Sequence, residues 1–159
     1  MRNTDITIRE CTFEYEDFHY RTPIKFGGVA LDRATVLNVE MTVATRTGKT
    51  AKGFGSMPLS NVWAYPSKVL DYAATLGAMK ELATRFHKTV NDYKDFGHAV
   101  DLGHALEAKF LSHLTPTTAD LKLADPIPPL AALVVASTFD AAIHDAYGKA
   151  QGQIGRAHV

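Results

Sequence analysis

The chain has a single cysteine, Cys11, so it cannot form a disulfide bond within itself. It also has no excess of either charge, because 17 Lys and Arg residues balance 17 Asp and Glu residues. No long run of like charge is present, so the basic surface that nucleic-acid binding requires is missing. These absences exclude a disulfide-stapled scaffold and predict no nucleic-acid partner. They favour a small neutral ligand or a protein surface.

Long hydrophobic runs are absent as well. The most apolar stretch, residues 130–136, is followed by Ser137, Thr138 and Asp140, and it is far shorter than the roughly 20 residues that span a bilayer. The first five residues lead into no apolar segment of the signal-peptide kind. We therefore predict no membrane span and a cytoplasmic location, with residues 130–136 in a buried helix.

What the chain does contain is enough apolar material for one domain with a real core, since 46% of its 159 residues are hydrophobic. Apolar and polar residues alternate over residues 6–15 and 37–43, which predicts two half-buried strands. A polar turn in which Gly48 takes a positive φ would then lead to a third strand over residues 50–55. The expected result is a three-stranded antiparallel meander.

Helical patterns follow the strands. Ser67 is a candidate N-cap for a first long helix, and a second helix fits residues 98–114. The segment 115–129 contains four prolines, so we predict a connection without a helix, with Pro129 in the first turn of the last helix. Strands followed by a helical bundle indicate an α+β fold in which the helices cover one face of the sheet.

Three stretches carry a family resemblance: residues 20–28 (YRTPIKFGG), residues 37–55 (LNVEMTVATRTGKTAKGFG) and residues 139–152 (FDAAIHDAYGKAQG). In this order and spacing they resemble the N-terminal capping domain of the mandelate racemase and muconate lactonizing branch of the enolase superfamily. The first is similar to the flexible loop that closes over the active site. The second is similar to the family's strand, glycine turn and strand, and the third to the helix that leads into the catalytic barrel.

The resemblance implies the chemistry of a larger parent enzyme. In this family, carboxylates of the barrel hold Mg²⁺, and Lys or His bases remove a proton next to a substrate carboxylate. We therefore expect a homo-oligomeric lyase or isomerase that acts on a small carboxylate, with sugar-acid dehydration as the first choice. Racemisation, epimerisation and cycloisomerisation are alternatives within the superfamily. A free-standing α+β binding domain is the alternative from another class.

The capping domain would occupy residues 1–152, and a barrel needs on the order of 200 residues more. We therefore expect the barrel to be missing from this chain, so that the chain holds no catalytic residue and no metal ligand, binds no cofactor and is inactive alone. Such a domain would select the substrate through two loops, residues 21–28 and 55–63. The predicted substrate-binding residues are Arg21, Lys25, Phe26, Ser56, Met57 and Trp63.

The last residues, 153–159, do not fit the continuation that the resemblance implies. Residues 154–159 read Ile-Gly-Arg-Ala-His-Val. A common sequencing adapter begins AGATCGGAAGAGCACACGTC, and one reading frame of it encodes these six residues. The next codon of the adapter in that frame is a stop codon. The first two bases of the adapter would complete the codon for Gln153. We interpret residues 153–159 as a non-native tail produced by adapter read-through. A natural polar tail is the alternative.

Two further patterns look like sites and are interpreted otherwise. The Gly-Lys-Thr at residues 48–50 lacks the first glycine of a phosphate-binding loop, because Val43 stands there, so a hairpin turn is predicted. Four residues of types that bind metals recur at intervals of three: His98, Asp101, His104 and Glu107. That spacing walks around a helix, which predicts a solvated face in place of a metal site.

The remaining candidates are single residues. His144 and Asp145 are neighbours on the last helix and point in different directions, so a capping or interface role is predicted for them. For His19 and Tyr20, contact with substrate and local packing both stay open. Cys11 lies in the first strand and is predicted to fill the core.

Overall fold

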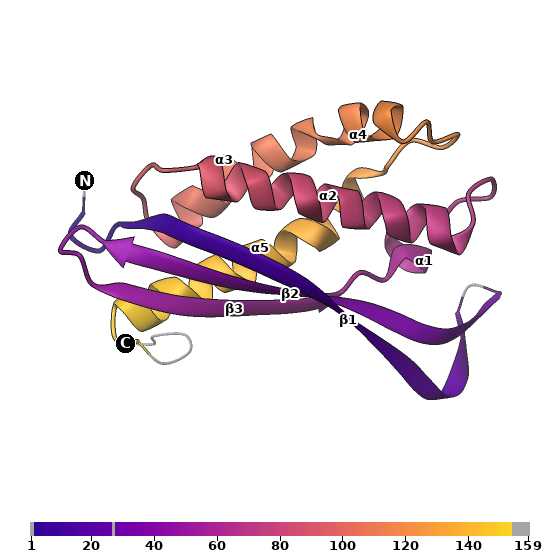
Figure 1. Ribbon diagram of the computed structural model, residues 1–159, viewed down its shortest axis with the longest axis horizontal. Helices are drawn as coiled ribbons and strands as arrows, with labels where there is room; N and C mark the ends of the chain where they lie inside the picture. The colour runs from indigo at the N-terminus through magenta and orange to yellow at the C-terminus, as the bar shows by residue number, and fades with distance from the viewer. Residues whose placement is uncertain (1, 27, 154–159) are drawn as a thin grey trace.

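Three antiparallel strands come first along the chain, and helices follow them (Figure 1). The computed structural model describes residues 2–26 and 28–153. Its elements are β1 (Ile6–Phe26), β2 (Val29–Thr45), β3 (Thr50–Pro58), α1 (Asn61–Ala64), α2 (Tyr72–Asp92), α3 (Ala99–Ser112), α4 (Leu114–Asp120) and α5 (Pro129–Ala150). The helices lie on one side of a sheet whose strand order is β1-β2-β3. The α+β fold predicted from the sequence is confirmed. The predicted non-native tail, apart from Gln153, lies outside the described residues.

The central strand, β2, places its apolar residues toward the helices. Its buried side chains recur at every second position: Leu37, Val39, Met41 and Val43. The polar residues between them face the other way, as the period of a strand requires. In the turn to β3, Gly48 has φ +85° and the Thr45 N–H donates to Lys49 O over 2.8 Å. The predicted meander and its glycine turn are therefore confirmed.

The first two strands are longer than the sequence analysis predicted. Residues 21–26, which we expected to belong to a flexible loop, are the end of β1, and residues 24–26 of this stretch pair with the start of β2. The register shifts between Ile8 and Glu10 and again between His19 and Ile24, and pairing resumes at Ile24 with Leu31. The prediction of a loop was wrong because the start of β2 supplies backbone partners that the alternation of residues 37–43 did not reveal. The result is a long β1–β2 hairpin whose tip extends beyond the helices (Figure 1).

The last helix, α5, lies directly against the edge strand β3. Gly53 and Gly55 make this possible, because a Cβ on Gly53 would overlap the backbone of Ala142 and Ala146. A Cβ on Gly55 would likewise overlap the carbonyl oxygen of Thr138. Both glycines are therefore required for the close approach of strand and helix.

Side chains of the helices satisfy backbone groups at both edges of the sheet. On β3, the Phe54 N–H donates to Asp145 Oδ2 over 2.9 Å. Of the two roles predicted for Asp145, this contact between α5 and β3 corresponds to the interface role and not to a helix cap. Burial acts to raise the pKa of Asp145, but hydrogen bonds from Lys149 and Phe54 outweigh it and leave this pKa lowered. On β1, Asn91 accepts from the Cys11 N–H over 2.9 Å and donates to the Cys11 carbonyl over 3.0 Å. These bonds occupy backbone groups of Cys11 and Phe54 that would otherwise be open at the two edges of the sheet.

The start of α2 differs from the prediction. Asp71 is the N-cap, and its Oδ1 accepts from the Ala74 N–H over 2.7 Å. Ser67 instead accepts from the Leu70 N–H over 3.0 Å and donates to Asp125 Oδ2 over 2.7 Å. The prediction that Ser67 caps the long helix was wrong because Asp125, distant in sequence, holds it in a separate turn.

The segment 115–129 also differs, since its first part belongs to α4. Pro116 lies in the first turn of this helix, where a missing N–H costs no intrahelical hydrogen bond. The predicted helix 98–114 is confirmed as α3, and Pro129 begins α5 as predicted. No helix in the described part of the chain has the length and apolarity that crossing a bilayer would require.

An aromatic cluster joins three of the helices. Phe86 of α2 and Phe110 of α3 stack with ring centroids 4.2 Å apart, and Phe139 of α5 lies 6.3 Å from Phe86. His113 lies beside this cluster, with Nε2 2.8 Å from the Thr89 hydroxyl. Burial, with a smaller effect of nearby Arg85, lowers the pKa of His113.

We expect Gly53→Ala and Gly55→Ala to destabilise the protein by about 1–3 kcal/mol or more, because the new Cβ meets backbone that cannot move aside. Gly77 is the matched control. It lies inside α2 with no atom within 4 Å of the added Cβ, so Gly77→Ala should stabilise by about 0.5–1 kcal/mol. Urea unfolding measures all three. Equal, small effects at all three positions would contradict the close contact between β3 and α5.

We expect acid to destabilise the protein partly through His113. Its folded pKa lies below its unfolded value of about 6.5, so the unfolded chain binds more protons as the pH falls. The contribution is fully present above about pH 7 and is lost as the pH falls below 6.5 toward the folded pKa. Thermal unfolding from about pH 7.5 to 5.5 should therefore show a smaller decline for His113→Gln than for the parent chain. An identical decline would contradict a lowered pKa.

Candidate functional site

The end of the β1–β2 hairpin and the short helix α1 lie together at one end of the molecule (Figure 1). Side chains of these elements, with Tyr72 of α2, line a groove. Its volume is about 320 Å³. We call it the hairpin groove, and its lining residues are Tyr20, Ile24, Phe26, Leu31, Arg33, Ala34, Thr35, Ser60, Asn61, Val62, Trp63 and Tyr72. Most of this wall is aromatic or aliphatic.

Two local structures position the wall. In the hairpin, the paired residues Ile24 and Leu31 share one face of the sheet, and this face lines the groove. Opposite them, α1 begins after Ser60, whose left-handed backbone (φ 47°) turns the chain away from β3. Asn61 then fastens α1 to α2, because its buried amide donates to the Tyr72 carbonyl over 3.1 Å and to the Thr75 hydroxyl over 2.9 Å.

The structure brings together two of the six predicted substrate-binding residues. Phe26 and Trp63 both line the hairpin groove, and their side chains are 45% and 52% exposed. Tyr20, which the sequence left undecided, lines it too, whereas His19 does not. Phe26 and Trp63 also border an adjoining hollow of about 440 Å³, so solvent reaches these two side chains from both sides. Their role in binding substrate stays a prediction.

The other four predicted residues do not line the groove. Arg21 and Lys25 are exposed, and Lys25 alternates with Phe26 along β1, which turns it to the opposite face. Ser56 donates to Asn38 Oδ1 over 2.7 Å on the solvent face of the sheet. Met57 is 37% exposed near the end of β3. None of the four is among the residues that line the groove, and their role in binding substrate stays a prediction.

Part of the groove wall was not predicted from the sequence. Arg33 and Tyr72 belong to it, and the Arg33 guanidinium carbon lies 5.8 Å from the centroid of the Tyr72 ring. Burial raises the pKa of Tyr72, and the charge of Arg33 offsets only part of this effect. The start of β2 was not recognised as a strand, so nothing in the local pattern pointed to Arg33. The N-cap Asp71 could have identified Tyr72 as the first residue of α2.

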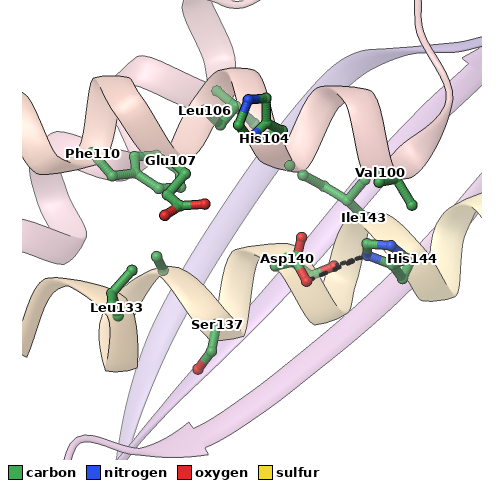
Figure 2. A pocket seen from close by; sticks show the side chains of 12 residues that line it. Val100, His104, Leu106, Glu107, Phe110, Leu133, Ser137, Asp140, Ile143 and His144 are labelled. Carbon is green, nitrogen blue, oxygen red and sulfur yellow. Dashed lines mark hydrogen bonds and ion pairs between the residues drawn. The ribbon is translucent and has the colours of Figure 1, made fainter. Parts of the chain in front are cut away.

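A second pocket, of about 390 Å³, lies between α3 and α5 (Figure 2). Its rim holds His104 and Glu107 from α3 and Asp140 and His144 from α5. His144 Nδ1 lies 3.0 Å from the Asp140 carbonyl oxygen and 3.4 Å from its carboxylate. The floor is apolar and includes Leu106, Phe110 and Ile143.

Two of the four residues spaced by three, His104 and Glu107, line this pocket. His98 is the N-cap of α3, with Nδ1 accepting from the Val100 N–H over 3.2 Å. Asp101 does not line the pocket, so only His104 and Glu107 of the four reach it. Among the residues that the structure describes, no three His, Cys, Asp or Glu side chains are placed to hold a metal ion.

No protein-family model and no curated protein matches the chain. Solved structures share its fold. An enolase from Bradyrhizobium, crystallised with magnesium and mandelic acid, has a TM-score of 0.53 at 18% identity, covering 93% of this chain and 33% of that one. The L-talarate/galactarate dehydratase from Salmonella typhimurium LT2 has a TM-score of 0.53 at 14% identity, covering 94% and 32%.

The chain therefore has the fold of one part of these enolase-superfamily enzymes. It spans about a third of the length of each. At such low identity the likeness shows the fold alone. The likeness does not establish the activity or the substrate of this chain.

We expect two intrinsic probes to report opposite environments in the folded chain. Trp63, the only tryptophan, is half exposed, so acrylamide should quench its fluorescence readily. Cys11 is 2% exposed, and burial raises its pKa to about 12, so dithionitrobenzoate should react with it only after denaturant is added. A shielded tryptophan, or a thiol that reacts at once in the native protein, would contradict this arrangement.

Proposed function

We propose that residues 1–152 form the capping domain of a Mg²⁺-dependent enzyme of the enolase superfamily, one that removes the α-proton of a carboxylate substrate. The observation that carries this proposal is the hairpin groove, an exposed aromatic surface at one end of the domain. Such a surface is typical of a place that another domain or a ligand covers. The shared fold and the family resemblance of the sequence support the same proposal.

In this proposal, the domain contributes enclosure of the substrate. Phe26 and Trp63 would form apolar walls that exclude water from the reacting centre. Arg21 and Lys25, on the neighbouring part of the hairpin, would meet anionic or hydroxyl groups, and Ser56 and Met57 would act from the end of β3. Closure of such loops commonly completes an active site.

The metal belongs to the barrel in this proposal, and the described residues of this chain do not fit it, since they offer no set of three ligands. Mg²⁺ in such a barrel stabilises the enediolate that forms when the α-proton leaves. The barrel would also supply the bases. A cytoplasmic location and a homo-oligomeric parent enzyme are part of the same proposal.

Several reactions of the superfamily remain candidates for the parent enzyme. Sugar-acid dehydration is the first choice from the sequence resemblance. Racemisation, epimerisation and cycloisomerisation are the alternatives, and they begin with the same proton abstraction. A free-standing binding domain is the other alternative, and the hairpin groove would then be its ligand site.

The decisive experiment starts with the source DNA. Long reads through and beyond the codon for Gly152 should show an open frame that encodes a barrel with Lys or His bases and three carboxylate ligands. The continuous protein should then exchange the α-proton of a 2-hydroxy carboxylate with solvent deuterium in an NMR assay, and EDTA should abolish the exchange. A native stop codon directly after residue 159 would instead favour the binding domain and would also sink the adapter interpretation.

Within that continuous protein, we expect Trp63→Ala to lower kcat/KM by roughly tenfold or more, because an aromatic wall and its exclusion of water are lost. Phe54→Ala is the matched control, since Phe54 is similarly exposed (50%) but lies outside the hairpin groove. Steady-state kinetics of both variants make the comparison. Equal losses in the two variants would contradict a role for the groove in substrate binding.

A further inference from the structure

The face of the sheet that points away from the helices has no described element packed on it. Phe13 and Tyr15 pack against the core, so the residues that alternate with them along β1 point to solvent. On β2 the same face carries the residues that alternate with the buried Leu37 and Val39. The helices lie on the other face (Figure 1). We call the uncovered surface the outer face.

The pairing of β1 with β2 arranges the outer-face residues in rows. Counted along β2, Phe18 lies opposite position 34, Glu14 opposite position 38 and Lys25 opposite position 30. These positions are an even number of residues apart, so all three side chains share the outer face. Leu31 and Arg33, at the odd positions between them, line the hairpin groove on the other face. With a rise of about 3.3 Å per residue, Glu14 and Lys25 each lie roughly 13 Å from Phe18, on opposite sides of it.

Negative charge gathers on one side of Phe18. Glu14, Glu16 and Glu40 all lie there on the outer face and are exposed. Within the described part of the chain, no Lys, Arg or His forms an ion pair with any of the three. Like charges on neighbouring positions of a sheet repel one another. A positive group brought to this part of the outer face would relieve the repulsion.

Other charges near these residues are offset by neighbours. Glu10 and Lys52 lie in the same row, on either side of β2. The Asp32 carboxylate lies 3.4 Å from Arg33 Nε. The outer face therefore has an acidic half, formed by the three glutamates, and a basic end at Lys25. Phe18, whose side chain is 45% exposed, lies between them.

A surface with opposite charges at equal distances from a central apolar residue is complementary to itself. A twofold axis that lies between two copies and crosses their strands at Phe18 would place Glu14 of one copy opposite Lys25 of the other. The reverse pair would form at the same time. Two sheets commonly pack face to face about 10 Å apart with their strands nearly aligned. Glu and Lys side chains that extend from both sides can bridge this separation.

Edge-to-edge pairing of β1 with β1 of a second copy is the other way in which two sheets could join. The regular part of this edge, residues 12–19, is centred on residues 15 and 16. Antiparallel pairing there would bring Glu14 and Glu16 of one chain beside the same residues of the other, on the same face. Like charges directly opposite one another are destabilising. The charges therefore favour contact between faces over contact between edges.

We propose that two copies of this chain associate through the outer face, with Phe18 against Phe18 and with Glu14 of each copy paired with Lys25 of the other. The proposal does not depend on the proposed enzyme, and it gives a surface to the homo-oligomer that the proposed function includes. The hairpin groove lies on the opposite face of the sheet, so it stays open in the dimer.

Sedimentation velocity of the 159-residue chain over a range of protein concentrations tests the proposal. We expect a monomer–dimer equilibrium whose dissociation constant rises with salt, because salt screens the ion pairs. Glu14→Lys and Lys25→Glu should each weaken the dimer by roughly tenfold or more, because each change turns two attractive pairs into two repulsive ones. The double variant should recover most of the affinity, because both pairs form again with their signs exchanged.

Two further variants separate the outer face from the rest of the surface. Phe18→Ala should weaken the dimer, because the central apolar contact is lost. Glu107→Lys is the matched control for charge reversal, since Glu107 is exposed on α3, and it should leave the dissociation constant unchanged. Circular dichroism confirms that each variant is folded.

Three results would overturn the proposal. The first is a chain that stays monomeric or forms only open aggregates. The second is a dimer that Glu14→Lys leaves unchanged or tightens, as edge pairing predicts. The third is a double variant that associates no better than the single variants. None of these results bears on the proposed enzyme, because proton exchange by the continuous protein is measured separately.

Discussion

The arrangement of the helices depends on the contact between β3 and α5. Because Gly53 and Gly55 carry no side chain, the helix backbone lies against the strand with nothing between them. From this position α5 also packs on β2, α2 and α3. The aromatic cluster around Phe86 and the pocket between α3 and α5 both follow from where this one contact places the helix.

The same construction explains why the candidate site lies at one end of the molecule. Where helices cover the sheet, their side chains also satisfy its edges, as Asn91 does for Cys11 and Asp145 for Phe54. Beyond the helices, the hairpin continues with no layer above it except α1, so its apolar residues stay exposed. A large exposed aromatic surface lowers solubility, and such surfaces are typical of places that a partner or a ligand covers.

Substrate preference shows how little the fold alone decides. The two fold neighbours described above share 14–18% identity with this chain, and one is a sugar-acid dehydratase while the other was crystallised with mandelic acid. The fold is common to both. In this chain, the buried donors of Asn61 and Thr35 in the groove wall are occupied by the protein itself.

The sequence by itself determined the three-stranded meander, α3, the start of α5 and the positive φ of Gly48, because periodicity and turn chemistry are local. It also pointed to Phe26 and Trp63. The tertiary structure alone decided that residues 24–26 pair with the start of β2 and that Asp125 holds Ser67 away from the helix start. It also decided that Arg33 and Tyr72 join the groove wall. Each of these depends on partners distant in the sequence, which no local pattern records.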